Sequence, residues 1–243
     1  MSVFGFSTET SSGDFTPIVK YDARAGLLFR MDRVQGSDGS FTSEPVEITD
    51  IFKALADFEN IEVGWIDFST GSAPSFVLVP RGKMLPERPS ANHKQGIRFL
   101  LKLARECGGD KPIREIAGTS KAFLSAAEKV VAQYDAEKAA HPGQLPVIMF
   151  DGKAVPVKTG TGNKSSTNYH PKFKIVGWAP RGDLVPQPRG TTNPGAVATN
   201  GVSAAVATNG AAPATGAQRA APPNLAVAAT RQNVPDDFSS DFG

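Results

Sequence analysis

The chain has 243 residues, one cysteine and a formal net charge of +2, but this charge is unevenly distributed. Residues 1–79 carry a net charge of −7 (5 Lys and Arg against 12 Asp and Glu), and residues 80–182 carry a net charge of +10 (18 against 8). One cysteine excludes an internal disulfide, and charge or proline interrupts every apolar run well before the ~20 residues that a membrane-spanning helix needs. These totals favour a globular body with an acidic and a basic face, and we expect no membrane role.

The first third of the chain has the pattern of β-structure. It begins MSVFGFSTET, without the basic segment and apolar run of a secretory signal, so we expect a cytoplasmic location. Short apolar runs between turn residues predict strands over about 15–21, 25–32, 41–48, 61–68 and 74–79. A short helix is expected over DIFKALADF, because Thr49 can cap it and its apolar residues have helical spacing.

The middle of the chain predicts two amphipathic helices. Residues 94–106 place apolar side chains on one face and a basic stripe, Lys94, Arg98 and Lys102, on another. A second helix is expected from a cap at Thr119 or Ser120 to about residue 139. We interpret both as a helical insertion, about residues 92–140, among the strands.

Strand signals return after residue 140. The run LPVIMF, the turn Asp151-Gly152 and the run KAVPVK predict a β-hairpin. A glycine-rich loop then leads to NYHPKFKIVGW, where strict alternation would place Lys172, Lys174 and Trp178 on one face and Phe173 and Ile175 on the other. One face is expected to be core and the other basic and aromatic.

Residues 183–235 have a different composition, dominated by Ala, Pro, Gly, Thr and Asn, with AVATNG at 196–201 and again at 205–210. Such a segment cannot bury a core, so it predicts a disordered linker with a mean reach of about 35–40 Å. An acidic, aromatic tip follows at 236–243. Its distinctive residues are Asp236, Asp237, Phe238, Asp241 and Phe242.

Acidic tips with phenylalanine suit protein partners, because carboxylates pair with a basic rim while a ring fills an apolar pocket. Two other roles stay open for this tip. It can occupy the protein's own basic groove and be displaced by nucleic acid, or it can serve only as an acidic solubility tail.

Cations and flat side chains gather where a single strand could bind. Residues 153–181 hold six Lys and Arg and no acidic residue, interleaved with aromatic rings, and cations that track phosphates beside rings that stack on bases bind single strands. A second basic cluster occupies the proline-rich loop from residue 81. The predicted nucleic-acid-binding residues are Trp65, Arg81, Lys83, Arg88, Lys158, Lys164, Tyr169, Lys172, Lys174 and Trp178. The alternative is a solvated strand edge whose lysines block aggregation.

A basic, strand-rich body, a low-complexity spacer and the tip DDFSSDF together resemble the single-stranded DNA-binding proteins of bacteria and their phages, in the manner of the divergent phage versions. The resemblance implies an OB-fold body, a small barrel, over residues 1–182, in the cytoplasm of a bacterium or an infected host cell. With the elements predicted above, we expect a mainly β fold with helical insertions (α+β). The resemblance also implies a groove that coats single-stranded DNA and a tail that recruits replication, recombination and repair proteins. Homo-oligomerisation stays open. The chain departs from the family by ending in Gly243 after Phe242, by carrying fewer acidic residues in its tip and by the two helices predicted within its body.

Other chemistry has little support in the sequence. GTGNKS lacks the spacing of a phosphate loop, and three scattered histidines with one cysteine do not suggest zinc. The acidic residues of the first third read as a solvated face, not as a magnesium site. We therefore expect no catalysis, no metal and no cofactor. Two alternatives remain, an interaction adaptor whose basic face meets an acidic protein and a divergent metal-dependent nuclease.

Overall fold

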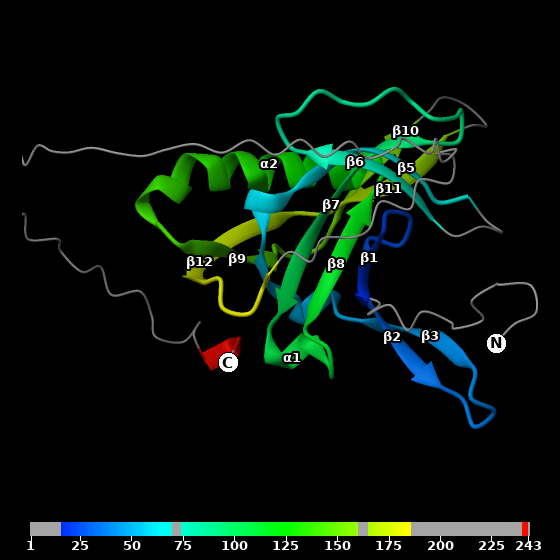
Figure 1. Cartoon of the computed structure of the whole chain (residues 1–243), viewed down its shortest axis with the longest axis horizontal. Coiled ribbons are helices and arrows are strands. Elements are labelled where there is room, and N and C mark those ends of the chain that lie inside the picture. Colours follow the sequence, from blue (N-terminus) through cyan, green and yellow to red (C-terminus); the bar gives the residue numbers. More distant parts are fainter. Residues whose placement is uncertain (1–15, 70–73, 160–164, 186–239, 243) are drawn as a thin grey trace, which may run out of the picture. The chain divides into compact units, whose positions relative to one another are not determined.

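The computed structural model describes residues 16–69, 74–159, 165–185 and 240–242 (Figure 1). These residues belong to one compact unit, which includes the described tip residues 240–242. Several predictions fall outside the described residues: the linker from residue 186 onward, and the site residues Lys164, Asp236, Asp237 and Phe238. Within the described residues, no helix is long and apolar enough to cross a membrane.

The described residues are mainly β-structure. Their strands are β1 (Ile18–Asp22), β2 (Leu27–Gln35), β3 (Phe41–Glu47), β4 (Lys53–Ala56), β5 (Glu62–Asp67), β6 (Ser75–Pro80), β7 (Lys94–Leu103), β8 (Ile113–Gly118), β9 (Gln144–Phe150), β10 (Val155–Thr159), β11 (Ser166–His170) and β12 (Phe173–Pro180). Their helices are α1 (Arg105–Gly108), α2 (Lys121–Glu137) and the 3₁₀ turns η1 (Thr49–Ile51), η2 (Phe58–Asn60) and η3 (Lys138–Ala140).

Ten strands form one sheet whose neighbours are mostly distant in sequence. The order is β12-β9-β4-β7-β8-β1-β2-β3, and β5 joins it by pairing with β7 and β6. Strands β1 and β8 run parallel, and the other neighbouring strands are antiparallel. The path does not return from β3 to β12, so the described strands leave this sheet open. Strands β10 and β11 form a separate ribbon.

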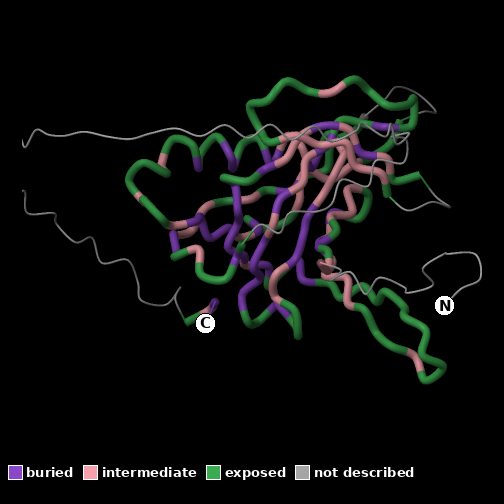
Figure 2. The backbone as a smooth tube through the Cα atoms, in the orientation of Figure 1, coloured by how far each residue is buried: buried purple, intermediate pink, exposed green. Residues whose placement is uncertain are grey.

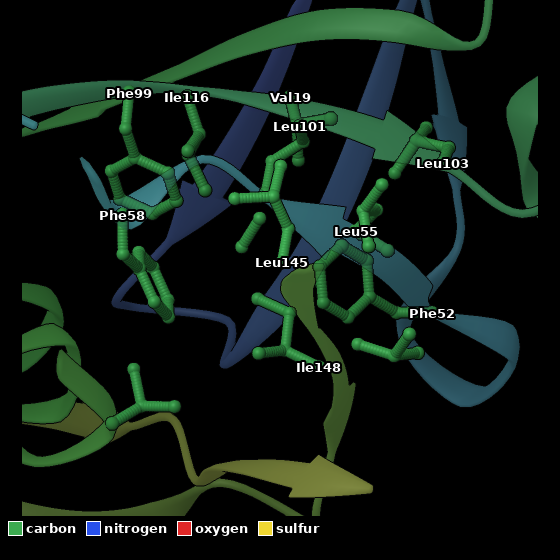
Figure 3. Close-up of a cluster of buried hydrophobic side chains, with 14 of the residues drawn as sticks. Val19, Phe52, Leu55, Phe58, Phe99, Leu101, Leu103, Ile116, Leu145 and Ile148 are labelled. Carbon is green, nitrogen blue, oxygen red and sulfur yellow. The ribbon is translucent and has the colours of Figure 1, made fainter. Parts of the chain in front are cut away.

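One hydrophobic core joins the sheet to α2. Figure 3 shows its centre, with Phe52, Phe58 and Leu101 among the buried side chains. The ring of Phe58 packs edge-on against Phe99 and Tyr134, with centroid distances of 5.3 and 5.7 Å. Because Tyr134 belongs to α2, this contact holds the helix against one face of the sheet. In contrast, every residue of β3 is exposed, and the β2–β3 ribbon extends away from the core (Figure 2).

Several sequence predictions are confirmed. The five strands expected in the first third correspond to β1, β2, β3, β5 and β6. The helix expected after Ser120 is α2, and the Ser120 hydroxyl accepts a hydrogen bond from the Phe123 amide at 3.2 Å, as an N-cap does.

The helix predicted over residues 94–106 is wrong, because residues Lys94–Leu103 form β7 and only the short α1 follows. Lys94, Arg98 and Lys102 recur every four residues, a spacing that keeps side chains on one face of a helix and equally on one face of a strand. Long-range pairing decides the outcome, because β7 has β4 and β5 on one side and β8 on the other. The expected helical insertion over 92–140 therefore reduces to α1, α2 and η3.

Two further local predictions are wrong. The segment DIFKALADF is not one helix, since η1 and η2 flank the strand β4, which pairs with β7 and β9. The chain bends at Gly152, which has a positive φ of 69°. However, the strands on its two sides do not pair with each other: β9 pairs with β12 and β4, and β10 pairs with β11.

The folded body extends past the predicted boundary at residue 182. Leu184 is fully buried in the core, and Asp183 accepts a hydrogen bond from Lys102 at 2.7 Å. The Lys102 ammonium lowers the pKa of Asp183, chiefly through this hydrogen bond. Residues 183–185 are therefore part of the body.

Candidate nucleic-acid interface

An apolar groove of about 550 Å³ lies between α2 and the strands β5 and β7. We call it the α2 groove. Its apolar lining comes from both sides: Ile61, Val63, Ile97, Leu124, Ala127 and Val131. Grooves of this kind, apolar with a few polar groups at the rim, are where proteins commonly bind ligands.

Strand register builds one side of this groove. Val63 lies opposite Ile97, and Trp65 lies opposite Gln95, in the antiparallel pairing of β5 with β7. Alternate residues of a strand project from the same face of a sheet, so Trp65 lies on the same face of β5 as Val63. On the helix, Leu124 and Val131 are seven residues apart and share a face.

Gly64 keeps the strands beside the groove close together. Its φ is +155°, and a Cβ added at this position would lie 2.3 Å from the carbonyl oxygen of Val77 on β6. Any other residue at this position would push β5 and β6 apart. The sequence therefore needs glycine between Val63 and Trp65 to hold their strand in place.

Charged and apolar side chains from the segment after β6 form part of the rim. Arg81 donates two hydrogen bonds to Asp135 of α2, at 2.6 and 2.9 Å. The pKa of the Asp135 carboxyl lies well below its usual range, chiefly because of this contact with Arg81. Lys83 is exposed beside this ion pair, and Met84 is 92% exposed. Arg81 and Lys83 were both predicted to bind phosphates, but Arg81 is already paired with a carboxylate.

Trp65 and Arg88 are held together near the groove. The indole Nε1 of Trp65 donates to the Pro86 carbonyl at 2.8 Å, and the guanidinium carbon of Arg88 lies 5.6 Å from the ring centroid. Arg88 donates in turn to the carbonyl oxygens of His93 at 2.8 Å and Ala91 at 2.5 Å. The β6–β7 loop therefore fixes both an aromatic ring and a cation, the two groups that single-strand binding uses.

The predicted residues of β10, β11 and β12 form a second group. Tyr169 is half-buried because β11 packs on the turn after β1. The Tyr169 amide donates to the Ala23 carbonyl at 2.7 Å, and the Tyr21 hydroxyl donates to the Tyr169 carbonyl at 2.6 Å. Lys158 and Lys172 are exposed. Lys174 is exposed too and pairs with Asp151 at 2.9 Å, an ion pair that contributes little at the surface.

The prediction that Trp178 presents an open ring is wrong. Trp178 is only 7% exposed, and its ring stacks on His141 with a centroid distance of 4.3 Å. The pairing of β12 with β9 shifts between Ile175 and Gly177. This bulge moves the alternation by one residue, so Trp178 turns to the buried face that Ile175 occupies.

The sequence patterns did not indicate the apolar residues that line the α2 groove. Val63, Ile97 and Leu124 come from three separate elements, and each looks like an ordinary core residue in the sequence. The structure brings four predicted residues to this region, namely Trp65, Arg81, Lys83 and Arg88. The residues on β10, β11 and β12 stay a separate group. Helix α2 packs against β11 and β12 as well as lining the groove, so it touches both groups.

The described part of the C-terminal tip lies against the body. The Lys53 ammonium forms an ion pair with the Asp241 carboxylate. Phe242 is only 9% exposed and packs beside Leu55 and Ala179. The described tip residues, 240–242, therefore do not line the α2 groove, although Arg181 of the predicted basic segment helps to form the pocket beside Phe242.

No protein-family model, curated protein or solved structure matches this chain. Among the described residues, no group of three or more His, Cys, Asp or Glu is placed to hold a metal ion. The function must therefore be argued from the geometry of the groove and of the tip.

Proposed function

We propose that this chain binds single-stranded DNA without strong sequence preference and takes part in replication, recombination or repair. The observation that carries the proposal is the arrangement of Trp65, Arg88 and Lys83 beside the α2 groove. Stacking on an aromatic ring contributes about 1–3 kcal/mol per base and tolerates every base, because each base has a π-face. Cations beside the ring follow the phosphates, which are identical in every sequence.

The chemistry of the groove favours unpaired bases over a duplex. In a duplex the faces of the bases are stacked on each other, so neither Trp65 nor the apolar floor formed by Val63 and Ile97 could reach them. A single strand exposes those faces. Exposed Lys158 and Lys172 would then extend the phosphate path beyond the groove.

The body is proposed to be a divergent OB-like fold. Its long-range strand order, single parallel pair and open sheet are compatible with a partly open Greek-key barrel whose sheet carries an oligonucleotide. In this proposal the tip residues serve partner proteins of the replication or recombination machinery of a phage or bacterium. The role is one of binding and requires no cofactor.

A titration with labelled oligonucleotides tests the proposal. A ~30-nucleotide single strand, the matching duplex and an RNA strand would be titrated at two salt concentrations, with and without magnesium. We expect the DNA strand to bind more tightly than the duplex, with affinity that falls as salt rises. Absence of single-strand binding at low salt would refute the proposal and favour the protein adaptor. Magnesium-dependent cleavage would favour the nuclease.

A further inference from the structure

The tip seats an aromatic ring in a pocket formed by β4, β7 and the end of β12. We call it the tip pocket, and its lining is Leu55, Lys102, Ala179, Pro180, Arg181 and Gly182. About 180 Å³ of space remains beside the ring of Phe242. The ring is nonetheless only 9% exposed, so its burial removes most of its apolar surface from water.

Contacts that involve no described tip residue tie the lining of the pocket to the body. Arg181 donates to Asp57 at 2.8 Å and to the Leu184 carbonyl at 3.2 Å. Lys102 donates to Asp183 at 2.7 Å, which ties the segment after β12 to β7. The tip then adds a matching charge of its own, because Asp241 pairs with Lys53 of β4. The ring of Phe242 therefore lies in an apolar pocket, while the adjacent Asp241 carboxylate pairs with the Lys53 ammonium.

The tip pocket and the α2 groove lie on opposite faces of β7. Lys102 is five positions from Ile97 and seven from Gln95, and an odd separation along a strand places side chains on opposite faces. Lys102 and Ile97 are also separated by about 16 Å along the strand. The two cavities share no lining residue.

We propose that the tip pocket is a dedicated docking site for the chain's own Asp241–Phe242 segment, separate from the nucleic-acid groove. Tip and single strand then bind the body at the same time and do not compete for one site. A partner protein must draw Phe242 out of this pocket to bind the tip, so the pocket sets how much of the tip is available. The statement about the strand rests on the proposed function, whereas the docking itself does not.

Zero-length carbodiimide cross-linking of the full-length chain tests the docking. The reagent joins a carboxylate to an amine that touches it, so the Lys53–Asp241 contact should give a cross-linked peptide detectable by mass spectrometry. The exposed Lys174–Asp151 pair, 2.9 Å apart, involves no residue of the tip pocket and serves as an internal control. The experiment would be repeated on a mixture of isotopically heavy and light chains. Because docking is proposed within one chain, each Lys53–Asp241 cross-linked peptide should be entirely heavy or entirely light.

Two substitutions at the ring sharpen the test. F242A leaves both cross-linking groups in place but removes the buried ring, so we expect the Lys53–Asp241 yield to fall at least about fivefold. The Lys174–Asp151 yield should not change. F242W should keep the yield within about twofold, since the remaining cavity can take the larger ring.

A second arm repeats the cross-linking of the unaltered chain with a saturating ~30-nucleotide single strand, and the Lys53–Asp241 yield should stay within about twofold. A missing cross-link, mixed-label peptides, or an unchanged yield in F242A would overturn the docking. Selective loss of the Lys53–Asp241 product on adding the strand would overturn the separation of the two sites. If titration shows no strand binding, the proposed function fails, while the DNA-free arm still decides the docking.

Discussion

The guanidinium carbon of Arg88 lies 5.6 Å from the ring centroid of Trp65, and the loop that carries Arg88 also binds the indole N–H. Both groups are therefore positioned before any ligand arrives. A base that stacks near this ring would bring its phosphate close to exposed Lys83 and to Arg88 itself. This relationship is the basis of the predictions about binding.

Lys83→Ala should weaken single-strand binding and reduce its salt dependence. Loss of one phosphate contact is expected to make the slope of log K against log salt shallower by about 0.7 for a single strand. Lys111→Ala is a matched control, because Lys111 is also exposed but lies in the turn between α1 and β8. Equal slopes for Lys83→Ala and the unaltered chain would place the phosphate path elsewhere.

Trp178→Ala should destabilise the fold far more than Trp65→Ala. Trp178 is buried against His141 and Tyr134, and truncating a buried tryptophan costs about 3–5 kcal/mol in the free energy of unfolding. The half-buried Trp65 should cost about 1 kcal/mol or less. Urea denaturation of both variants checks this order. A similar loss for the two would contradict the assignment of Trp178 to the core.

Gly64→Ala should also destabilise the fold, by more than about 3 kcal/mol, because the added methyl group meets the Val77 carbonyl at 2.3 Å. Gly82→Ala is the control. Gly82 has a φ of +88° but no atom within 4 Å of an added Cβ, so only backbone strain of about 1–2 kcal/mol is expected. Thermal unfolding of both variants would reveal the difference, and equal melting temperatures would argue against close packing of β5 on β6.

Cys107 should resist alkylation in the folded protein. Burial is the largest cause that raises the pKa of its thiol above the ordinary 9.0, so the reactive thiolate is scarcer at pH 8 than for an exposed cysteine. The thiol is also fully buried. Iodoacetamide labelling at pH 8 should be at least about 100-fold slower in the native protein than in urea. Rapid native labelling would show that the segment around α1 opens readily.

Local sequence patterns predicted elements whose residues interact mainly with near neighbours. Helix α2 has a capping serine and a sustained apolar face, and both are visible in the sequence. The sequence of β7 fits a helix as well as a strand, because a four-residue repeat suits both structures, and only its pairing with β4, β5 and β8 distinguishes them. The bulge that buries Trp178 is equally non-local, since it depends on the register with β9.

The site was predicted in part for the same reason. Aromatic and basic residue types marked Trp65, Lys83 and Arg88, because their chemistry is visible one residue at a time. The α2 groove was not foreseen, since its apolar lining is assembled from β5, β7 and α2. The tip was recognised from its composition, but its docking beside Lys53 requires a contact across 188 positions of the chain.

Intrinsic fluorescence tests the central claim most directly, because the chain has only two tryptophans. W178F leaves Trp65 as the only tryptophan, and W65F leaves the buried Trp178. Each variant would be titrated with a ~30-nucleotide single strand. The fluorescence of W178F should be strongly quenched, because a base stacks near Trp65. The fluorescence of W65F should change little, and this variant should bind the strand more weakly. The reverse pattern, or no quenching of W178F at saturation, would contradict a nucleic-acid interface at Trp65.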